Sequence, residues 1–275
     1  MRLHRQIMAA RPYPGATKRA DGFARLALGT LDAVTGLRRR DANRTAELRF
    51  VARLIDCEYW GGLRACRAYA DRVRSVYAAE RSVSDYPVTK LVIEQLARAM
   101  LIPDVVFCCS TAVRPDRLRD IERRLRASRA NGDRVTFRIR GRARSTPIQR
   151  TIGGYWKMTP TLCKAVALAR WVRLVPGWMQ EESRYRRWVI DLTDRCAQEL
   201  PEKASLWLEV MRQLSRVQGH GSHRVRSVRA ARRAIDSVLE LAAESAVATG
   251  PQPASGVSAS GNPVPARGSK NAAGE

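Results

Sequence analysis

The sequence predicts an all-α fold: a multi-helix domain with one short extended segment and a disordered C-terminal tail. Three observations lead to this prediction. Apolar residues recur every three or four positions along several segments, which is the spacing of one helix face. One segment, Val135–Arg140, alternates apolar and charged residues as a half-buried strand does. The last 28 residues are rich in Pro, Gly, Ser and Ala and carry little that could be buried.

These patterns divide the 275 residues into three regions. Residues 1–19 hold Pro12, Pro14 and Gly15, so we expect an irregular leader there. The α-helical domain is expected over residues 20–247, and the disordered tail over residues 248–275.

Within the domain, a short helix is expected over residues 21–36. The clearest periodic segment follows, from Arg44 to Tyr77, and Gly61-Gly62 interrupts it because glycine weakens a helix interior. Another helix is expected to start at Ser84-Asp85-Tyr86-Pro87. There Asp85 can cap free N–H groups, and a proline in the first turn loses no hydrogen bond that it needs.

A further helix is expected to restart at Arg114-Pro115-Asp116. Three of its apolar side chains are expected to face inward: Leu118, Ile121 and Leu125. Asn131-Gly132-Asp133 signals a turn, after which Val135–Arg140 is predicted to form a lone ribbon or extended arm.

The second half of the domain is expected to be helical throughout. Breaks are expected at Pro176-Gly177, Pro201 and Gly219-His220-Gly221. The helices that these breaks separate are expected over residues 161–175, 178–200, 201–217 and 222–246.

The charge of the chain is strongly positive, at +24 with a pI near 11.1. Six of the 50 cations are lysines and the other 44 are arginines. Such a field attracts nucleic acid through counterion release, although the arginines are spread over nearly every segment. No apolar run approaches the length of a membrane span, and the N-terminus lacks the apolar core of a secretory signal. We therefore expect a cytoplasmic protein with no membrane partner.

The six cysteines form no C-x-x-C pair, so we expect buried thiols and neither disulfides nor a metal site. The pair Glu181-Glu182 is expected on a solvated helix face. Five tryptophans are expected to anchor the core rather than to stack with bases: Trp156, Trp171, Trp178, Trp188 and Trp207.

Motifs of known chemistry are missing from the sequence. It contains no G-x-x-x-x-G-K-[ST] phosphate loop and no G-x-S-x-G nucleophile elbow. No residue can be assigned a catalytic role on this basis.

One candidate anion site lies at the break before the last helix. Flexible backbone N–H groups at a helix N-terminus suit a phosphate or carboxylate, particularly beside arginines. The residues concerned are Gly219, His220, Gly221, Arg224 and Arg226. The same turn can equally be structural, with polar residues that cap the helix.

A second candidate site is the densest cationic cluster on a predicted loop, formed by Arg140, Arg142, Arg144 and Arg150. A solvated loop is the simplest interpretation. The functional alternative is contact with an acidic partner surface or an anion.

Four stretches, taken in order, resemble one known family. The first runs from Ala46-Glu-Leu-Arg-Phe to Arg81. The second, Pro87–Leu125, contains Ile102-Pro-Asp-Val-Val-Phe, and the third is Arg142–Val189. The fourth, Leu206–Ile235, includes the turn Val217-Gln218-Gly219-His220-Gly221, in which Gln218 replaces a usual cation and His220 a usual aromatic residue.

With these stretches, residues 40–240 resemble the helical C-terminal region of the indolepyruvate:ferredoxin oxidoreductase family. The family couples oxidation of aryl 2-oxoacids to coenzyme A acylation and ferredoxin reduction. The resemblance therefore implies a noncatalytic helical subunit or domain that accompanies a thiamine-dependent oxidoreductase subunit. Thiamine diphosphate and iron–sulfur clusters are expected in that partner and not in this chain, because the diphosphate-binding motif and the cysteine runs are missing. An Arg-rich helical nucleic-acid-binding protein is the alternative.

Overall fold

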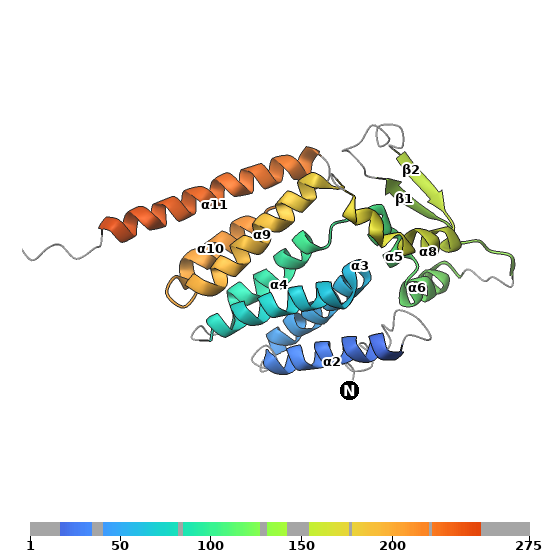
Figure 1. The fold of residues 1–275 in the computed structure, drawn as a ribbon, viewed down its shortest axis with the longest axis horizontal. Coiled ribbons are helices and arrows are strands. Elements are labelled where there is room, and N and C mark those ends of the chain that lie inside the picture. The colour runs from blue at the N-terminus through green and yellow to red at the C-terminus, as the bar shows by residue number, and fades with distance from the viewer. Residues whose placement is uncertain are drawn as a thin grey trace, which may run out of the picture.

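The chain is all-α in the computed structural model, and an antiparallel hairpin is the only sheet among the residues described (Figure 1). The structure describes residues 17–34, 41–81, 85–126, 131–141, 154–175, 178–219 and 222–248. Most of the predicted leader and all but the first residue of the predicted tail lie outside these ranges.

The elements follow one another as a long helical body with a smaller end. The first helices are α2 (Thr17–Ala33), α3 (Asp41–Ala79), α4 (Pro87–Met100), α5 (Val105–Ala112) and α6 (Pro115–Leu125). The smaller end also contains β1 (Phe137–Gly141), β2 (Gly154–Met158), α8 (Pro160–Leu168) and the 3₁₀ helix η3 (Arg170–Leu174). The chain then returns to the body through α9 (Gln180–Glu199), α10 (Ala204–Ser215) and α11 (Ser222–Ala248).

Most predicted helices are confirmed, with shifts of a few residues at their ends. The predicted strand is confirmed as β1, which pairs with β2 so that Ile139 lies opposite Trp156. Sequence patterns did not predict β2 or α5. The helix expected over residues 161–175 is split into α8 and η3.

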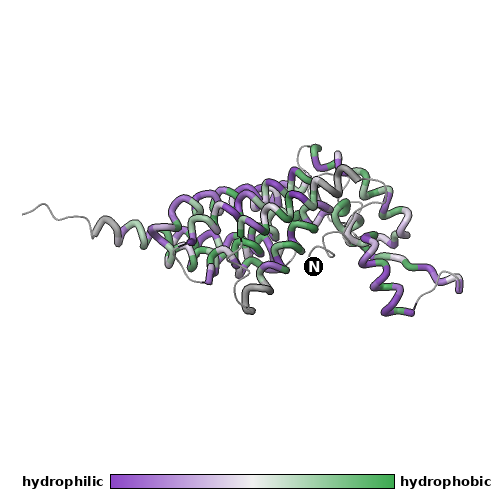
Figure 2. The backbone as a smooth tube through the Cα atoms, turned by 90° about the horizontal axis from the view of Figure 1, so that it is seen from below, coloured by the Kyte–Doolittle hydropathy of each residue, from purple (hydrophilic) through white to green (hydrophobic). Residues whose placement is uncertain are grey.

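The main core lies between α2, α3, α4, α9, α10 and α11. Its largest fully buried side chains include Phe50, Tyr69 and Trp207. Apolar and polar residues mix along the helices, as Figure 2 shows, and the apolar residues of these helices form stripes that face the core. Burial of these stripes holds the helices together, since isolated helices of such lengths are marginal in water.

A second, small core joins α5, α8 and the hairpin. Five buried residues form it: Cys109, Ala112, Ile139, Met158 and Cys163. Three of the five carry sulfur, and the Cys109 Sγ lies 3.7 Å from the Met158 Sδ. The small core therefore packs polarizable, adaptable side chains against one another.

The long helix α3 is kinked at Gly62, whose φ of 69° and ψ of −164° are not helical. This confirms the interruption predicted at Gly61-Gly62. A side chain at position 62 would be strained by the positive φ. The kink also interrupts the backbone ladder, so carbonyl groups just before it need other donors.

The six cysteines are free thiols. Five are buried and Cys108 is half-buried. The predictions for the large apolar side chains are only partly confirmed. Trp207 is fully buried, but Trp171 is 66% exposed. The inward placement of Leu125 is wrong as well, because α6 has no buried residue and Leu125 is 71% exposed.

The start of α4 is capped from a distance rather than by Asp85. The residue before the helix, Tyr86, is left-handed and makes no side-chain cap, and Asp85 instead pairs with Lys90 at 2.8 Å. The buried carboxylate of Glu80 caps the helix instead. Its Oε1 accepts from the Val88 N–H and its Oε2 from the Thr89 N–H, both at 2.7 Å. The Thr89 hydroxyl donates a third bond of 2.6 Å to Oε2.

We predict that Glu80→Ala lowers the free energy of unfolding by about 2–3 kcal/mol, because it leaves buried N–H groups without an acceptor. Urea unfolding followed by circular dichroism measures this loss. The control Glu244→Ala, on the exposed end of α11, should change stability by less than about 0.5 kcal/mol. Equal effects of the two substitutions would contradict the role of Glu80.

Candidate functional site

The η3 segment and the helix before it expose apolar side chains and turn arginines toward the body of the molecule. η3 has the sequence Arg170-Trp-Val-Arg-Leu174. Arg170 and Arg173 reach back to α3. Trp171 and Leu174, which lie on the other side of this turn, are 66% and 84% exposed. This is the reverse of the usual placement of polar and apolar residues at a protein surface.

Arg173 is held by three different groups. Its guanidinium forms a bidentate ion pair with Asp104, whose side chain is 1% exposed. It donates to the carbonyl of Trp60 and lies over the Trp60 ring, 4.7 Å from the ring centre. A planar guanidinium can satisfy a carboxylate, a carbonyl and an aromatic face together, which an ammonium group cannot do.

The kink in α3 supplies the other attachment points. The Tyr59 carbonyl accepts from Arg170 Nη2 at 3.2 Å and from Ser110 Oγ at 3.5 Å. The indole N–H of Trp60 donates to the Ile102 carbonyl at 3.1 Å, which ties the segment before α5 to the same place. The kink therefore offers carbonyl groups at the point where the two arginines arrive.

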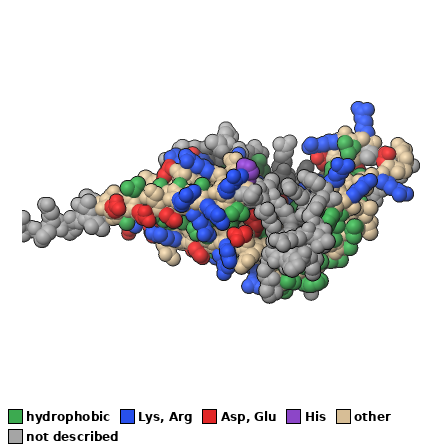
Figure 3. Space-filling view, turned by 90° about the horizontal axis from the view of Figure 1, so that it is seen from above, with side chains coloured by type: hydrophobic (Ala, Val, Ile, Leu, Met, Phe, Trp, Pro, Cys, Tyr) green, Lys and Arg blue, Asp and Glu red, His purple; other side chains and the backbone are tan. Residues whose placement is uncertain are grey.

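The exposed apolar side chains of this region form a surface that we call the ridge: Leu168, Trp171, Leu174 and Val175. Leu168 and Leu174 are the two most exposed, at 74% and 84%. Trp171 and Leu174 are three residues apart in a 3₁₀ helix and so share one side of it, and Leu168 and Val175 flank them in sequence. Figure 3 shows hydrophobic side chains gathered at this end of the molecule. Clustered apolar exposure of this kind marks an interaction surface.

The sequence around the ridge contains no acidic residue from Arg134 to Gln180, a span that holds ten cations. In the hairpin, Arg138 lies directly opposite Lys157, and both are exposed. Like charges at such a position repel each other. The ridge thus lies in the longest acid-free span of the chain, and an acidic surface would relieve this repulsion.

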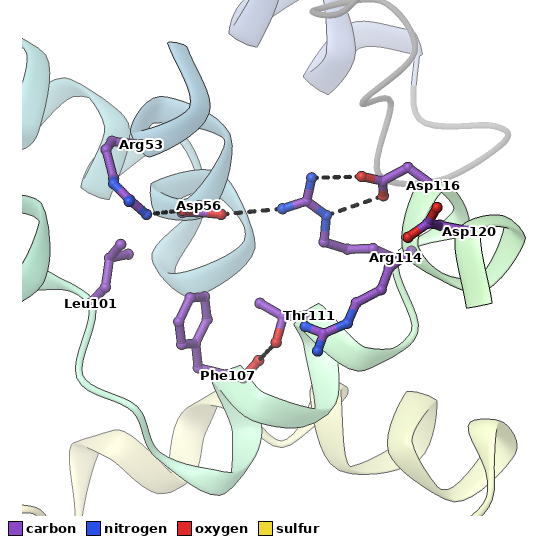
Figure 4. A pocket seen from close by; sticks show the side chains of 9 residues that line it. Arg53, Asp56, Leu101, Phe107, Thr111, Arg114, Asp116 and Asp120 are labelled. Carbon is purple, nitrogen blue, oxygen red and sulfur yellow. Dashed lines mark hydrogen bonds and ion pairs between the residues drawn. The ribbon is translucent and has the colours of Figure 1, made fainter. Parts of the chain in front are cut away.

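A polar cavity of about 570 Å³ lies between α3, α5 and α6, next to this end of the body (Figure 4). A chain of ion pairs crosses it. Arg53 contacts Asp56 at 2.9 Å, and Asp56 contacts Arg114 at 3.1 Å. Arg114 continues to Asp116 at 2.8 Å, while its guanidinium lies over the Tyr59 ring.

The electrostatics of this cavity follow from burial. Burial raises the pKa of Asp56, and the nearby Arg53 and Arg114 only partly offset that effect. Burial also acts to raise the pKa of Asp116, but the hydrogen bond and charge of Arg114 outweigh it and leave the pKa lowered. Because these charges are paired with one another, we interpret the ion pairs as structural contacts that hold α6 against α3.

The predicted anion site at residues 219–226 is only partly described. Gly219 is exposed with φ of 82°, and His220 and Gly221 lie outside the described residues. Arg224 points away toward α9: it pairs with Glu182 at 2.9 Å and lies over the Tyr185 ring. Arg226 is exposed, so among the predicted arginines it is the one that an anion could reach. Anion binding at this turn stays a prediction.

The Arg224 pair also corrects the solvated-face interpretation of Glu181-Glu182. Glu181 is exposed, but the Glu182 side chain is largely buried against Arg224. Consecutive helix positions differ by about 100° in direction, so one carboxylate faces water while the other faces α11.

The predicted basic loop falls mostly beyond what can be described. Arg140 occupies a register position opposite Tyr155 in the hairpin. Arg142, Arg144 and Arg150 lie outside the described residues.

No group of three or more His, Cys, Asp or Glu side chains within the described ranges is arranged to hold a metal ion. None of the helices described combines the length and apolar character that crossing a bilayer requires.

Comparison of the chain with models of protein families, with curated proteins and with solved structures finds no match. The candidate site therefore depends on the geometry described above. Sequence reasoning missed the ridge because it expected one helix over residues 161–175 with Trp171 in the core. The acid-free span from Arg134 to Gln180 was the signal that could have directed attention to this region.

We predict that Arg173→Lys lowers the free energy of unfolding by about 2 kcal/mol, because lysine keeps the charge but loses the bidentate pair to buried Asp104. Hydrogen exchange followed by mass spectrometry should show faster exchange across α8 and η3. Arg184→Lys is the matched control, since Arg184 forms an exposed pair with Glu181. Unchanged exchange in Arg173→Lys would show that the pair does not hold η3.

Proposed function

We propose that this chain acts by protein–protein contact, as a noncatalytic helical subunit that docks on a partner through the ridge. The exposure of Leu168, Trp171 and Leu174 carries this proposal. These side chains face water because Arg170 and Arg173 occupy the inward positions. The hydrogen bonds of these two arginines to α3 therefore decide which side of η3 is exposed. Contact with a partner would remove this apolar surface from water, the dominant favourable term in most associations.

The partner in this proposal is a thiamine-dependent 2-oxoacid oxidoreductase subunit. The resemblance of residues 40–240 to the C-terminal region of indolepyruvate:ferredoxin oxidoreductases supports that choice. In this scheme the partner binds thiamine diphosphate and the iron–sulfur clusters and carries out the oxidative decarboxylation of aryl 2-oxoacids in the cytoplasm. The present chain contributes a scaffold and a docking surface.

We predict that the double substitution Leu168→Ser/Leu174→Ser weakens capture of the thiamine-dependent subunit at least tenfold. Two exposed leucines that become buried on binding contribute about 2–3 kcal/mol together, and each 1.4 kcal/mol is about tenfold in affinity. The measurement is co-purification of the two co-expressed subunits, followed by titration calorimetry of the purified pair.

Leu125→Ser is the matched control, because Leu125 is as exposed as the ridge leucines but belongs to α6. It should bind the partner as the natural chain does. Equal binding by the double variant, or no co-purification of the natural chain, would remove the proposal. Thermal melting of each variant verifies that the fold is intact.

One observation favours nucleic-acid binding as a second candidate. The hairpin is a two-stranded ribbon with exposed Arg138 and Lys157 in an acid-free span, and ribbons of this kind fit the major groove of a duplex. Many arginines elsewhere in the described chain, however, are committed to carboxylates, as in the pairs of Arg53, Arg114 and Arg224.

If the second candidate is right, duplex DNA binds at about 50 mM salt and loses about tenfold or more in affinity by about 200 mM. Fluorescence anisotropy with a labelled duplex measures this dependence. Arg138→Ser/Lys157→Ser should weaken binding further than Arg229→Ser/Arg233→Ser, which removes two exposed cations from α11. Absence of binding at low salt would exclude the candidate.

A further inference from the structure

The last turns of α11 project from the helical body (Figure 1). α11 has 27 residues and its neighbour α10 has 12. At 1.5 Å per residue these helices measure about 40 Å and about 18 Å. The last buried side chain of α11 is Ile235, and Leu239 is the last that packs against the main core. From Glu240 to Ser245 no side chain is buried, so little apolar packing supports this part of the helix, and a helical end with little such support is marginal in water.

The charges of α11 run against its own dipole. Its first half carries five arginines, at positions 224, 226, 229, 232 and 233. From Ala234 onward the helix has three acids and no cation. A helix favours acids near its N-terminus and cations near its C-terminus, so this arrangement does not stabilise α11 itself. A cationic surface placed against the C-terminal half would compensate for it.

The C-terminal half of α11, which includes the projecting end, combines acidity with exposed apolar surface. Asp236, Glu240 and Glu244 are spaced by four residues, so they share one side of the helix, and all three are exposed. Leu241 lies beside this acidic stripe and is 60% exposed. The surface that such a helix end fits is apolar and bordered by cations.

The opposite end of the same molecule has that character. The ridge is apolar, and it lies in the span from Arg134 to Gln180 that has no acid. Lys164 is exposed on α8 one helical turn before Leu168, and Lys157 is exposed on the hairpin. Figure 3 shows acidic side chains toward the projecting end of α11 and Lys and Arg side chains extending from the opposite end.

We propose that the projecting end of α11 of one copy docks on the ridge of a second copy of this chain. The two surfaces lie at opposite ends of an elongated molecule, so the contact joins different molecules head to tail (Figure 1). Contacts of this heterologous kind produce open chains or rings. The interface is small, and the net charge of +24 opposes association, so the self-association is weak and reversible.

This inference extends the proposed function, because the second copy and the partner subunit would compete for one ridge. A self-associated chain keeps its apolar surface covered until the partner displaces the neighbouring copy. Self-association of the full chain can be measured without any partner, so its outcome is independent of the capture experiment.

Sedimentation velocity at about 0.15 M salt, where charges more than about 8 Å apart are screened, provides the test. The natural chain should show a weight-average mass that rises with protein concentration. Glu240→Lys/Glu244→Lys reverses the acidic end, and Lys157→Glu/Lys164→Glu reverses the basic end. Each of these two variants should stay monomeric by itself, and an equimolar mixture of the two should associate again.

Arg229→Glu/Arg233→Glu is the control, because it changes the net charge as much as the basic-end variant does but alters the first half of α11. It should associate as the natural chain does. The proposal is overturned if the natural chain stays monomeric, if this control dissociates like the end variants, or if the mixture fails to associate. Circular dichroism of each variant separates loss of contact from loss of fold.

Discussion

Arg173 joins the smaller end of the molecule to the helical body, because its guanidinium pairs with Asp104 at the start of α5 and also donates to the Trp60 carbonyl of α3. Asp104 performs two tasks, since its carboxylate also caps α5 through the Phe107 N–H at 2.7 Å. Removing such a carboxylate from water is costly unless its oxygens are fully satisfied, and the bidentate guanidinium provides that satisfaction. The start of α5 and the position of η3 are thus fixed by one pair of side chains.

The outward face of η3 follows from this constraint. In so short a segment, two arginines that face inward turn the other side of the segment toward solvent. Trp171 and Leu174 are consequently directed to the surface. The apolar exposure is then a consequence of how the segment is anchored, and it persists as long as Gly62 keeps α3 kinked at the receiving carbonyls. While the smaller end is folded, the proposed docking surface is already in position before a partner arrives, which reduces the entropy lost on binding.

The helical part of the fold could be predicted because its periodicity is local. The stripe through α3 and the start of α4 at Pro87 are visible in the sequence, as is the interruption at Gly62. The cap of α4 could not be predicted, because Glu80 reaches its N–H groups across a turn. The direction of the ridge could not be predicted either, because Arg173 contacts Trp60, 113 positions away. Apolar periodicity indicates which residues share a face but not whether that face is covered, as Leu125 also shows.

The two cores of the molecule differ greatly in size, and this has a dynamic consequence. The body is held by a large apolar cluster, whereas α5, α8 and the hairpin share only five buried residues. Local opening free energies follow the buried contacts of each region. We therefore expect the smaller end to behave as a separate cooperative unit whose local opening costs less free energy than opening of the bundle. The chain can lose its recognition surface transiently while most of its helices stay folded.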